Sequence, residues 1–176
     1  NQIISGDIKY IELAEKMVYE IIETLVDSSL INKKVLTEDD ISNVKHAYEE
    51  LSNLITVPDY DDDMTIDSLK ENIKSQVYEK VEFLKGFITP DTMEDYLKRL
   101  ILFFLDNAWQ DHMIAFDDLK QGIHLRAYAQ QDPLVIFKLE CFEMFDSMMN
   151  YVREEVLKSM LSSAIAFKAG LNKKGA

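Results

Sequence analysis

The fold of this chain is decided by residues 89–133, which read TPDTMEDYLKRLILFFLDNAWQDHMIAFDDLKQGIHLRAYAQQDP. Thr89 and Pro90 are residue types that favour the N-cap and the first position of a helix. Apolar residues then recur every three or four positions, the spacing of one helix face. This stripe consists of Leu97, Leu100, Ile101, Phe104, Leu105, Trp109, His112, Met113, Phe116 and Leu119. We expect one helix that ends at Gly122 and, at about 1.5 Å per residue, spans roughly 45 Å.

A second long helix is expected to begin at Asp132-Pro133, because Asp is a good N-cap and Pro fits the first helical position. Its apolar stripe consists of Leu134, Phe137, Cys141, Met144, Phe145, Met148, Tyr151, Val152 and Val156. Two long helices joined by about ten residues fold most simply as an antiparallel hairpin. The segment between them is then the tip of that hairpin.

Three shorter helices are expected upstream. Residues 7–30 have helical spacing with Asp7 as a candidate N-cap, and Thr37 with Asp40 forms a capping-box pattern. Residues 65–85 predict a third helix that ends at Gly86. The acidic segment VPDYDDDM, residues 57–64, lies between the second and third of these helices. It lacks the spacing of a calcium loop, so we interpret it as a solvated loop. The predicted fold class is all-α.

Composition narrows the classes of function. The chain has 176 residues, with 32 acidic and 19 basic side chains, so binding to nucleic acid or to an anionic membrane is disfavoured. Cys141 is the one cysteine, which excludes an intrachain disulfide and a cysteine-based zinc site. The longest apolar run, LILFFL, is far shorter than the ~20 residues of a membrane span. We expect a soluble, cytoplasmic chain with no transmembrane segment. Because the sequence starts with Asn1, we expect either a fragment of a longer protein or a processed chain.

Residues that carry catalysis or metal binding are not arranged in a known pattern. None of the three histidines belongs to a metal-binding motif, and phosphate-binding and nucleophile-elbow motifs are missing. Asp111 and His112 are neighbours, but adjacent helix positions point about 100° apart, so we interpret His112 as a helix-packing or solvent-edge histidine. The chain by itself is not expected to be an enzyme, to bind a cofactor or to bind a metal.

Several apolar side chains admit two interpretations. Trp109 lies on the stripe between Leu105 and Phe116, and we expect it in the core because such a face must be covered. Five methionines either fill the core, which we favour, or line an adaptable groove for a partner helix. They are Met113, Met144, Met148, Met149 and Met160.

The tip differs in charge from the rest of the chain. Residues 119–131 contain two basic residues and no acidic one, with Tyr128 near the centre. From the residues alone, two readings stand equal. Either Tyr128 packs under the turn while Arg126 caps the carbonyls of the preceding helix, or both offer an open contact surface.

Residues 105–145 resemble the C-terminal helical scaffold of SecA, the motor ATPase family of bacterial protein export. The resemblance is carried by a long pattern of the form W-x-x-H-x-x-A-x-D-x-L-x-x-G-I-x-L-R-[AG]-Y-A-Q-x-[DN]-P-x-x-x-[YF]-K-x-E. Here the pattern is met by Trp109, His112, Ala115, Asp117, Leu119, Gly122, Ile123, Leu125, Arg126, Tyr128, Ala129, Gln130, Asp132, Pro133, Phe137, Lys138 and Glu140. Residues 7–86 are similar to the helical wing of that family only in order, length and helical character.

The resemblance implies a division of the chain and a set of contacts. Residues 1–88 would be the end of a scaffold helix and the helical wing, and residues 89–176 the scaffold with its two-helix finger, tip about 121–132. The implied fingertip consists of Arg126, Ala127, Tyr128, Ala129 and Gln130, which would contact the preprotein and the SecY channel. ATP and magnesium would bind elsewhere in the parent protein, whose ATPase domains would be further partners of this chain.

The resemblance also implies where the parent protein is located. Other functions of this chain stay open. The parent would be peripheral at the cytoplasmic face of the inner membrane. The Cys-rich zinc tail of many members is absent, so no zinc is expected. The alternatives are a free-standing helical adaptor that binds a partner helix and a regulatory module of the motor ATPase.

Overall fold

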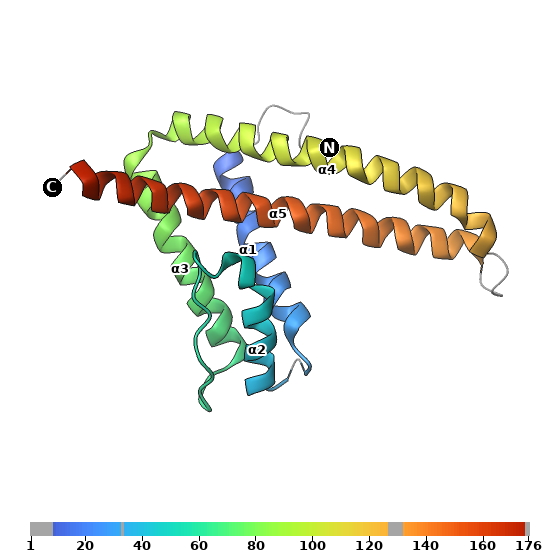
Figure 1. The fold of residues 1–176 in the computed structure, drawn as a ribbon, viewed down its shortest axis with the longest axis horizontal. Helices are drawn as coiled ribbons and strands as arrows, with labels where there is room; N and C mark the ends of the chain where they lie inside the picture. The colour runs from blue at the N-terminus through green and yellow to red at the C-terminus, as the bar shows by residue number, and fades with distance from the viewer. Residues whose placement is uncertain (1–8, 33, 127–131, 175–176) are drawn as a thin grey trace.

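The structure is a computed structural model that describes residues 9–32, 34–126 and 132–174 (Figure 1). Side chains are described for the same residues except 124–126 and 172–174. The expected all-α class is confirmed, since every regular element in these ranges is helical. The elements are α1 (Tyr10–Ser29), α2 (Glu38–Ala47), the 3-10 turn η1 (Glu49–Leu51), α3 (Ile66–Phe87), α4 (Pro90–Arg126) and α5 (Pro133–Lys174).

The expected long hairpin is present. Figure 1 shows α4 and α5 side by side and antiparallel, with α1 and α3 packed against one half of α5 and α2 packed against α1. The other half of the hairpin extends beyond these three helices toward the segment that joins α4 to α5. The molecule therefore has a thick, many-helix end and a thin, two-helix end.

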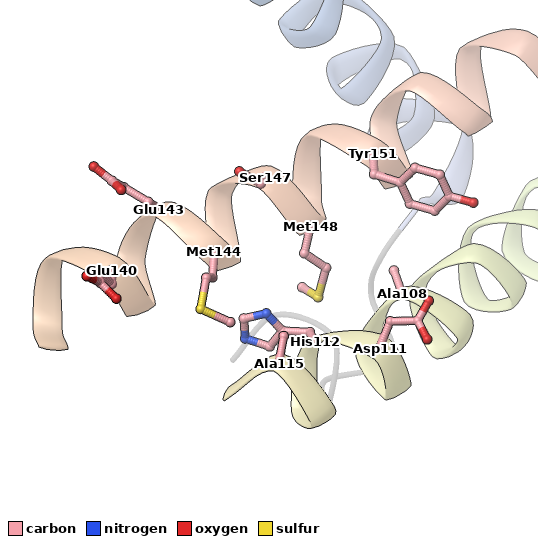
Figure 2. Close-up of a pocket in the computed structure, with 10 residues that line it drawn as sticks. All are labelled: Ala108, Asp111, His112, Ala115, Glu140, Glu143, Met144, Ser147, Met148 and Tyr151. Atoms are coloured by element: carbon pink, nitrogen blue, oxygen red, sulfur yellow. The ribbon is translucent and has the colours of Figure 1, made fainter. Parts of the chain in front are cut away.

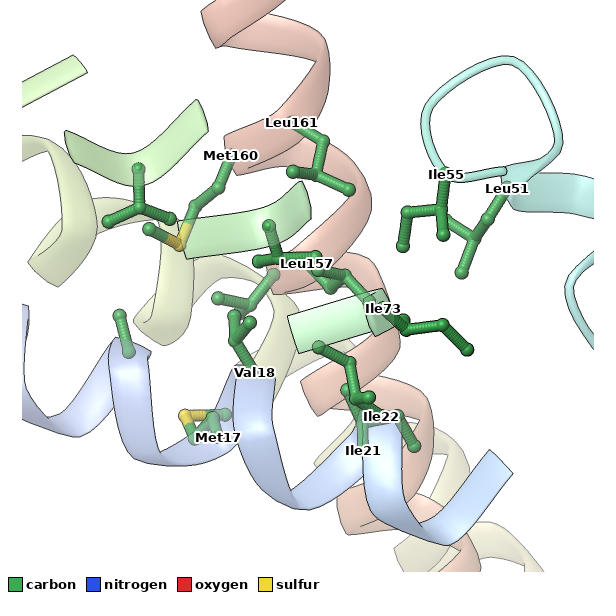
Figure 3. Close-up of a cluster of buried hydrophobic side chains, with 14 of the residues drawn as sticks. Met17, Val18, Ile21, Ile22, Leu51, Ile55, Ile73, Leu157, Met160 and Leu161 are labelled. Carbon is green, nitrogen blue, oxygen red and sulfur yellow. The ribbon is translucent and has the colours of Figure 1, made fainter. Parts of the chain in front are cut away.

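One apolar core holds the thick end together. Figure 3 shows α5 side chains such as Leu157 and Met160 meeting Val18 and Ile22 of α1 and Ile73 of α3. Each of these five side chains is almost fully buried. The cluster includes residues on both sides of residue 88, so the division of the chain at that point stays a prediction.

Hydrogen-bonding side chains mark the starts of three helices. The capping box predicted at Thr37 and Asp40 is confirmed, and Thr65 forms a second capping box with Ser68. Asp132 accepts a hydrogen bond at 2.9 Å from the Leu134 N–H, as expected for an N-cap before Pro133. These caps fix where α2, α3 and α5 begin.

The N-terminus of α1 is capped in a different way. The helix begins after Lys9, which makes no side-chain cap, and Asp7, our candidate N-cap, lies outside the described residues. The Glu94 carboxylate of α4 accepts hydrogen bonds from the Tyr10 N–H and, at 3.0 Å, from the Ile11 N–H. A side chain distant in sequence thus caps α1 and joins it to the base of the hairpin.

Two predicted helix ends are wrong. Gly86 and Gly122 lie inside α3 and α4, which continue to Phe87 and Arg126. A glycine inside a helix costs only about 1 kcal/mol relative to alanine, and continuing the helix keeps its backbone hydrogen bonds satisfied. The segment between α4 and α5 is therefore shorter than we expected.

Ion pairs connect the α1–α3 bundle to α5 and the helices of the bundle to each other. Arg153 donates to Glu20 of α1 at 3.0 Å, and Lys158 donates to Glu50 of η1 at 2.6 Å. Between α3 and α1, the paired residues are Lys70 with Asp27, Lys74 with Glu23 and Lys85 with Glu15. The cations are largely covered, so these pairs fix orientation more than exposed pairs do.

A search of the described helices for a segment long and apolar enough to cross a membrane finds none.

Candidate interaction site on the hairpin

The thin end of the hairpin leads to the predicted tip. It is built from the last turns of α4, a helix of 37 residues, and the first turns of α5, a helix of 42 residues. Arg126 is the last residue of α4, and its side chain is outside the described set. Ala127, Tyr128, Ala129 and Gln130 lie outside the described residues, so their predicted role as a contact surface stays a prediction.

Aromatic contacts hold the two helices together near the tip. The rings of Phe116 on α4 and Phe137 on α5 lie 5.7 Å apart, and those of His112 and Phe145 lie 6.1 Å apart. These pairs also give the register of the hairpin, since residues near 112 are level with residues near 145. His112 therefore packs between the helices, as we expected.

The prediction that Trp109 is in the core is wrong for this chain. Its side chain is 47% exposed and lies against His112, with ring centroids 5.5 Å apart. Two helices cover only the surfaces that face each other, and Trp109 is not among the described residues that form the core or pack against it. Trp109 lies about 100° around α4 from the buried Ala108, outside that shared surface.

A groove runs between α4 and α5 on one side of the hairpin (Figure 2). Its volume is about 820 Å³, and Met144 and Met148 point from α5 toward His112 on α4. Its full lining is Ala108, Asp111, His112, Ala115, Glu140, Glu143, Met144, Ser147, Met148 and Tyr151. The floor is apolar and the rim carries three carboxylates.

The methionines divide between the two interpretations. Met148 and Met160 are buried and fill the core, as favoured, while Met113 is exposed. Met144 is half-buried and lines the groove beside Met148. The acidic rim was not predicted, although Glu140 and Glu143 are three residues apart and therefore lie on one side of α5.

No three acidic, histidine or cysteine side chains in the described ranges come close enough to hold a metal ion. The features of the candidate site are an acidic groove, an exposed aromatic side chain beside it and an adjoining basic tip sequence.

Comparison with known families decides the identity of the region. The family model for the SecA wing and scaffold domain matches residues 1–164. The chain belongs to this SecA family. The suspected resemblance is thereby confirmed, and it extends over the N-terminal helices, where sequence similarity had been weak.

Curated relatives agree with this assignment. A protein translocase subunit SecA of Chloroflexus aurantiacus is 30% identical over 167 residues, which cover 90% of this chain and 16% of that protein. The subunit of Legionella pneumophila is 32% identical over 158 residues, covering 88% of this chain and 18% of its own length. That of Acidobacterium capsulatum is 38% identical over 96 residues, 54% of this chain and 10% of its own.

The chain spans less than a fifth of the length of these SecA relatives. Its match is to the wing and scaffold, a non-catalytic region of these proteins. The division into residues 1–88, as the end of a scaffold helix and the wing, and residues 89–176, as the scaffold with its two-helix finger, stays a prediction.

Proposed function

We propose that this chain is the wing-and-scaffold portion of an ATP-driven preprotein translocase, and that its hairpin delivers motion of the ATPase domains to the polypeptide being exported. The observation that carries the proposal is the form of the hairpin in a chain of the SecA family. Paired helices of 37 and 42 residues are anchored at one end in a many-helix core and extend at the other to a short tip. A long pair of helices that is anchored at one end can act as a lever.

Contacts at the thick end support a rigid anchor. Val156 and Leu157 of α5 are fully buried in the shared core. The Tyr96 and Ser163 hydroxyls are hydrogen-bonded at 2.9 Å, which ties α4 to α5. Arg153 and Lys158 attach α5 to α1 and η1. Motion applied to this end would be transmitted along the helices because close-packed interiors deform little.

The tip sequence suits contact with many different polypeptides. Tyr128 offers a broad apolar ring with a polar end, so it contacts varied sequences without a specific hydrogen bond. Arg126 can donate to backbone carbonyls or carboxylates, and the absence of acids from 119–131 avoids repelling acidic segments. Ala127, Ala129 and Gln130 complete the proposed contact surface.

The proposed partners follow from this role. They are the preprotein, the SecY channel and the ATPase domains of the same parent chain, where ATP and magnesium would bind. The parent would be cytoplasmic and peripheral at the cytoplasmic face of the inner membrane. With 32 acidic residues against 19 basic ones, nucleic acid is not a proposed partner.

A substitution in the full-length parent tests the role. Tyr128→Ala is expected to slow preprotein transport while ATP turnover without substrate is kept. His46→Ala is the matched control, because the His46 side chain is exposed and His46 lies outside the proposed fingertip. Normal transport by the Tyr128→Ala variant would show that the Tyr128 side chain is not needed for transport and would contradict the proposed role of the tip.

The groove favours a second candidate function, that of an adaptor or regulatory module that binds a partner helix. Met144 and Met148 form an adaptable apolar floor between the small residues Ala108 and Ala115. Ala115→Trp would fill the groove without touching the tip. Unchanged transport by Ala115→Trp together with impaired transport by Tyr128→Ala would favour the lever, and the reverse pattern would favour the adaptor.

A further inference from the structure

A row of ion pairs joins α1 to α3. Each pair takes its acid from α1 and its base from α3: Asp27 with Lys70 at 2.7 Å, Glu23 with Lys74 at 2.6 Å, and Glu15 with Lys85. As the residue number rises along α1 it falls along α3, so the two helices are antiparallel. The row therefore has a fixed register, in which each position of α1 lies level with a known position of α3.

Two tyrosines interrupt this row. The acids lie on a ridge of α1 that has a residue every four positions, and Tyr19 fills the position between Glu15 and Glu23. In the same register, Tyr78 is the residue of α3 that lies level with Tyr19. Neither tyrosine hydroxyl forms a hydrogen bond with a residue in the described part of the chain. The position where the row would continue with an ion pair thus carries two aromatic rings.

A groove lies at these two rings. Its volume is about 570 Å³, and its lining is Tyr19, Glu71, Lys74, Ser75 and Tyr78. Tyr19 is half-buried and packs against the core, whereas Tyr78 is 54% exposed. One ring is therefore held in place by the core, and the other is available to a partner.

Carboxylates outnumber cations around the two rings. On either side of the tyrosines along the helices, one lysine lies between two glutamates: Lys74 with Glu23 and Glu71, and Lys85 with Glu15 and Glu82. Four glutamates against two lysines leave a net charge of −2. Burial and then the charge of Glu15 raise the pKa of Tyr19, although Lys85 acts in the opposite direction. The surroundings of the rings therefore favour a positive charge.

The distribution of charge over the chain favours the same kind of partner. Residues 1–88 contain 19 acidic and 9 basic side chains, and residues 89–176 contain 13 and 10. The first half thus has a formal charge of −10 and the second half −3, which together make the −13 of the chain. A basic partner is consequently attracted to the half that contains α1 and α3 more than to the hairpin.

We propose that the groove at Tyr19 and Tyr78 binds an arginine side chain of a basic polypeptide segment. The guanidinium would stack on the exposed ring of Tyr78, and the Glu71 carboxylate, which also lines the groove, would supply the opposite charge. A planar guanidinium suits both contacts, because it stacks on aromatic faces and pairs with carboxylates.

Other occupants fit the groove less well. An acidic segment would be repelled by the net negative charge, and an apolar one would remove water from carboxylates without replacing their hydrogen bonds. The proposed site is formed by α1 and α3 alone, so the inference does not depend on the transport role proposed for the hairpin.

Fluorescence anisotropy with the full 176-residue chain tests the proposal. The probe is a short, labelled peptide of arginine, glycine and serine, and its control peptide has glutamine in place of arginine. The arginine peptide is expected to bind more tightly. Tyr78→Ala is expected to raise its dissociation constant at least about threefold, because the contact between cation and ring is lost. Tyr78→Phe keeps the ring and is expected to bind like the unsubstituted chain.

Tyr151 provides a matched control for the ring. It is 50% exposed, close to the 54% of Tyr78, and it lines the acidic groove of the hairpin. Tyr151→Ala is therefore expected to leave the affinity unchanged, which separates the two grooves. For the charge, Glu71→Gln is compared with Glu38→Gln, which removes the same charge from an exposed position on α2. We expect Glu71→Gln to weaken binding and Glu38→Gln to have little effect.

Circular dichroism checks that the variants are folded, which is expected because the Tyr78 and Glu71 side chains are exposed. The proposal is overturned if the arginine and glutamine peptides bind equally, or if Tyr78→Ala and Tyr151→Ala have equal effects. It is also overturned if Tyr78→Phe weakens binding as much as Tyr78→Ala, or if Glu38→Gln weakens it as much as Glu71→Gln.

Discussion

The cap that Glu94 provides for α1 gives the sharpest prediction about the fold. Lys9 caps nothing, so the first amides of α1 depend on a carboxylate from α4, 83 or 84 positions away in sequence. Glu94→Ala removes both hydrogen bonds and a negative charge from the positive end of the helix. Loss of an N-cap costs about 0.5–2 kcal/mol, and the interaction of a charge with the helix end contributes about 0.3–1 kcal/mol. Since the two effects overlap, we expect a loss of about 1–2 kcal/mol in the free energy of unfolding.

The assay for Glu94 combines urea unfolding with amide hydrogen exchange. Besides the lost stability, the Tyr10 and Ile11 amides are expected to exchange faster, while amides in the centre of α3 do not. Asp95→Ala is the control, because Asp95 is the exposed neighbour of Glu94 and makes no such contact with α1. The reasoning is refuted if the two variants unfold at the same urea concentration, or if exchange at Tyr10 is unchanged.

Three further predictions concern the core and one buried carboxylate. Leu157→Ala is expected to lower the free energy of unfolding by about 2–5 kcal/mol, measured by urea denaturation, because Leu157 is fully buried where α5 meets the bundle. Tyr48→Phe is expected to cost about 1 kcal/mol in the same assay, since the buried Tyr48 hydroxyl donates to the Ile22 carbonyl at 3.0 Å; an unchanged midpoint would contradict it. Burial raises the pKa of Asp40, but hydrogen bonds from Ile31 and Thr37 outweigh burial and hold the pKa below its ordinary value. Its contribution to stability is therefore present above the unfolded-state pKa and lost as pH falls through the lowered one, so the stability gap between wild type and Asp40→Asn is expected to narrow below about pH 4. A gap independent of pH would contradict that account.

Local sequence signals predicted the features that depend on neighbours in the chain. The hairpin, the capping box of Thr37 and Asp40 and the cap at Asp132 all follow from residues a few positions apart. The family resemblance carried by the residues around the tip was sufficient to identify the region, since the family match includes them. Each of these results needs only a short stretch of sequence.

Features that depend on distant or missing neighbours were not predictable. No sequence pattern near Glu94 indicates that its side chain caps a helix that starts 84 positions earlier in the chain. Trp109 lies on an apolar stripe, but its burial depends on whether another surface covers that side of the hairpin. Gly122 has the residue type of a helix end, yet α4 continues because its backbone remains satisfied and nothing crowds that position. Local pattern fixes an element, and tertiary surroundings fix its limits and exposure.

The measurement that tests the central proposal most directly is photo-crosslinking during transport, with the probe at position 128 of the full-length parent and a control probe at position 46. The account predicts adducts from position 128 to the moving preprotein or to the SecY channel, and none from position 46. An active motor that forms no adduct from position 128 would contradict it and would make the hairpin a structural support.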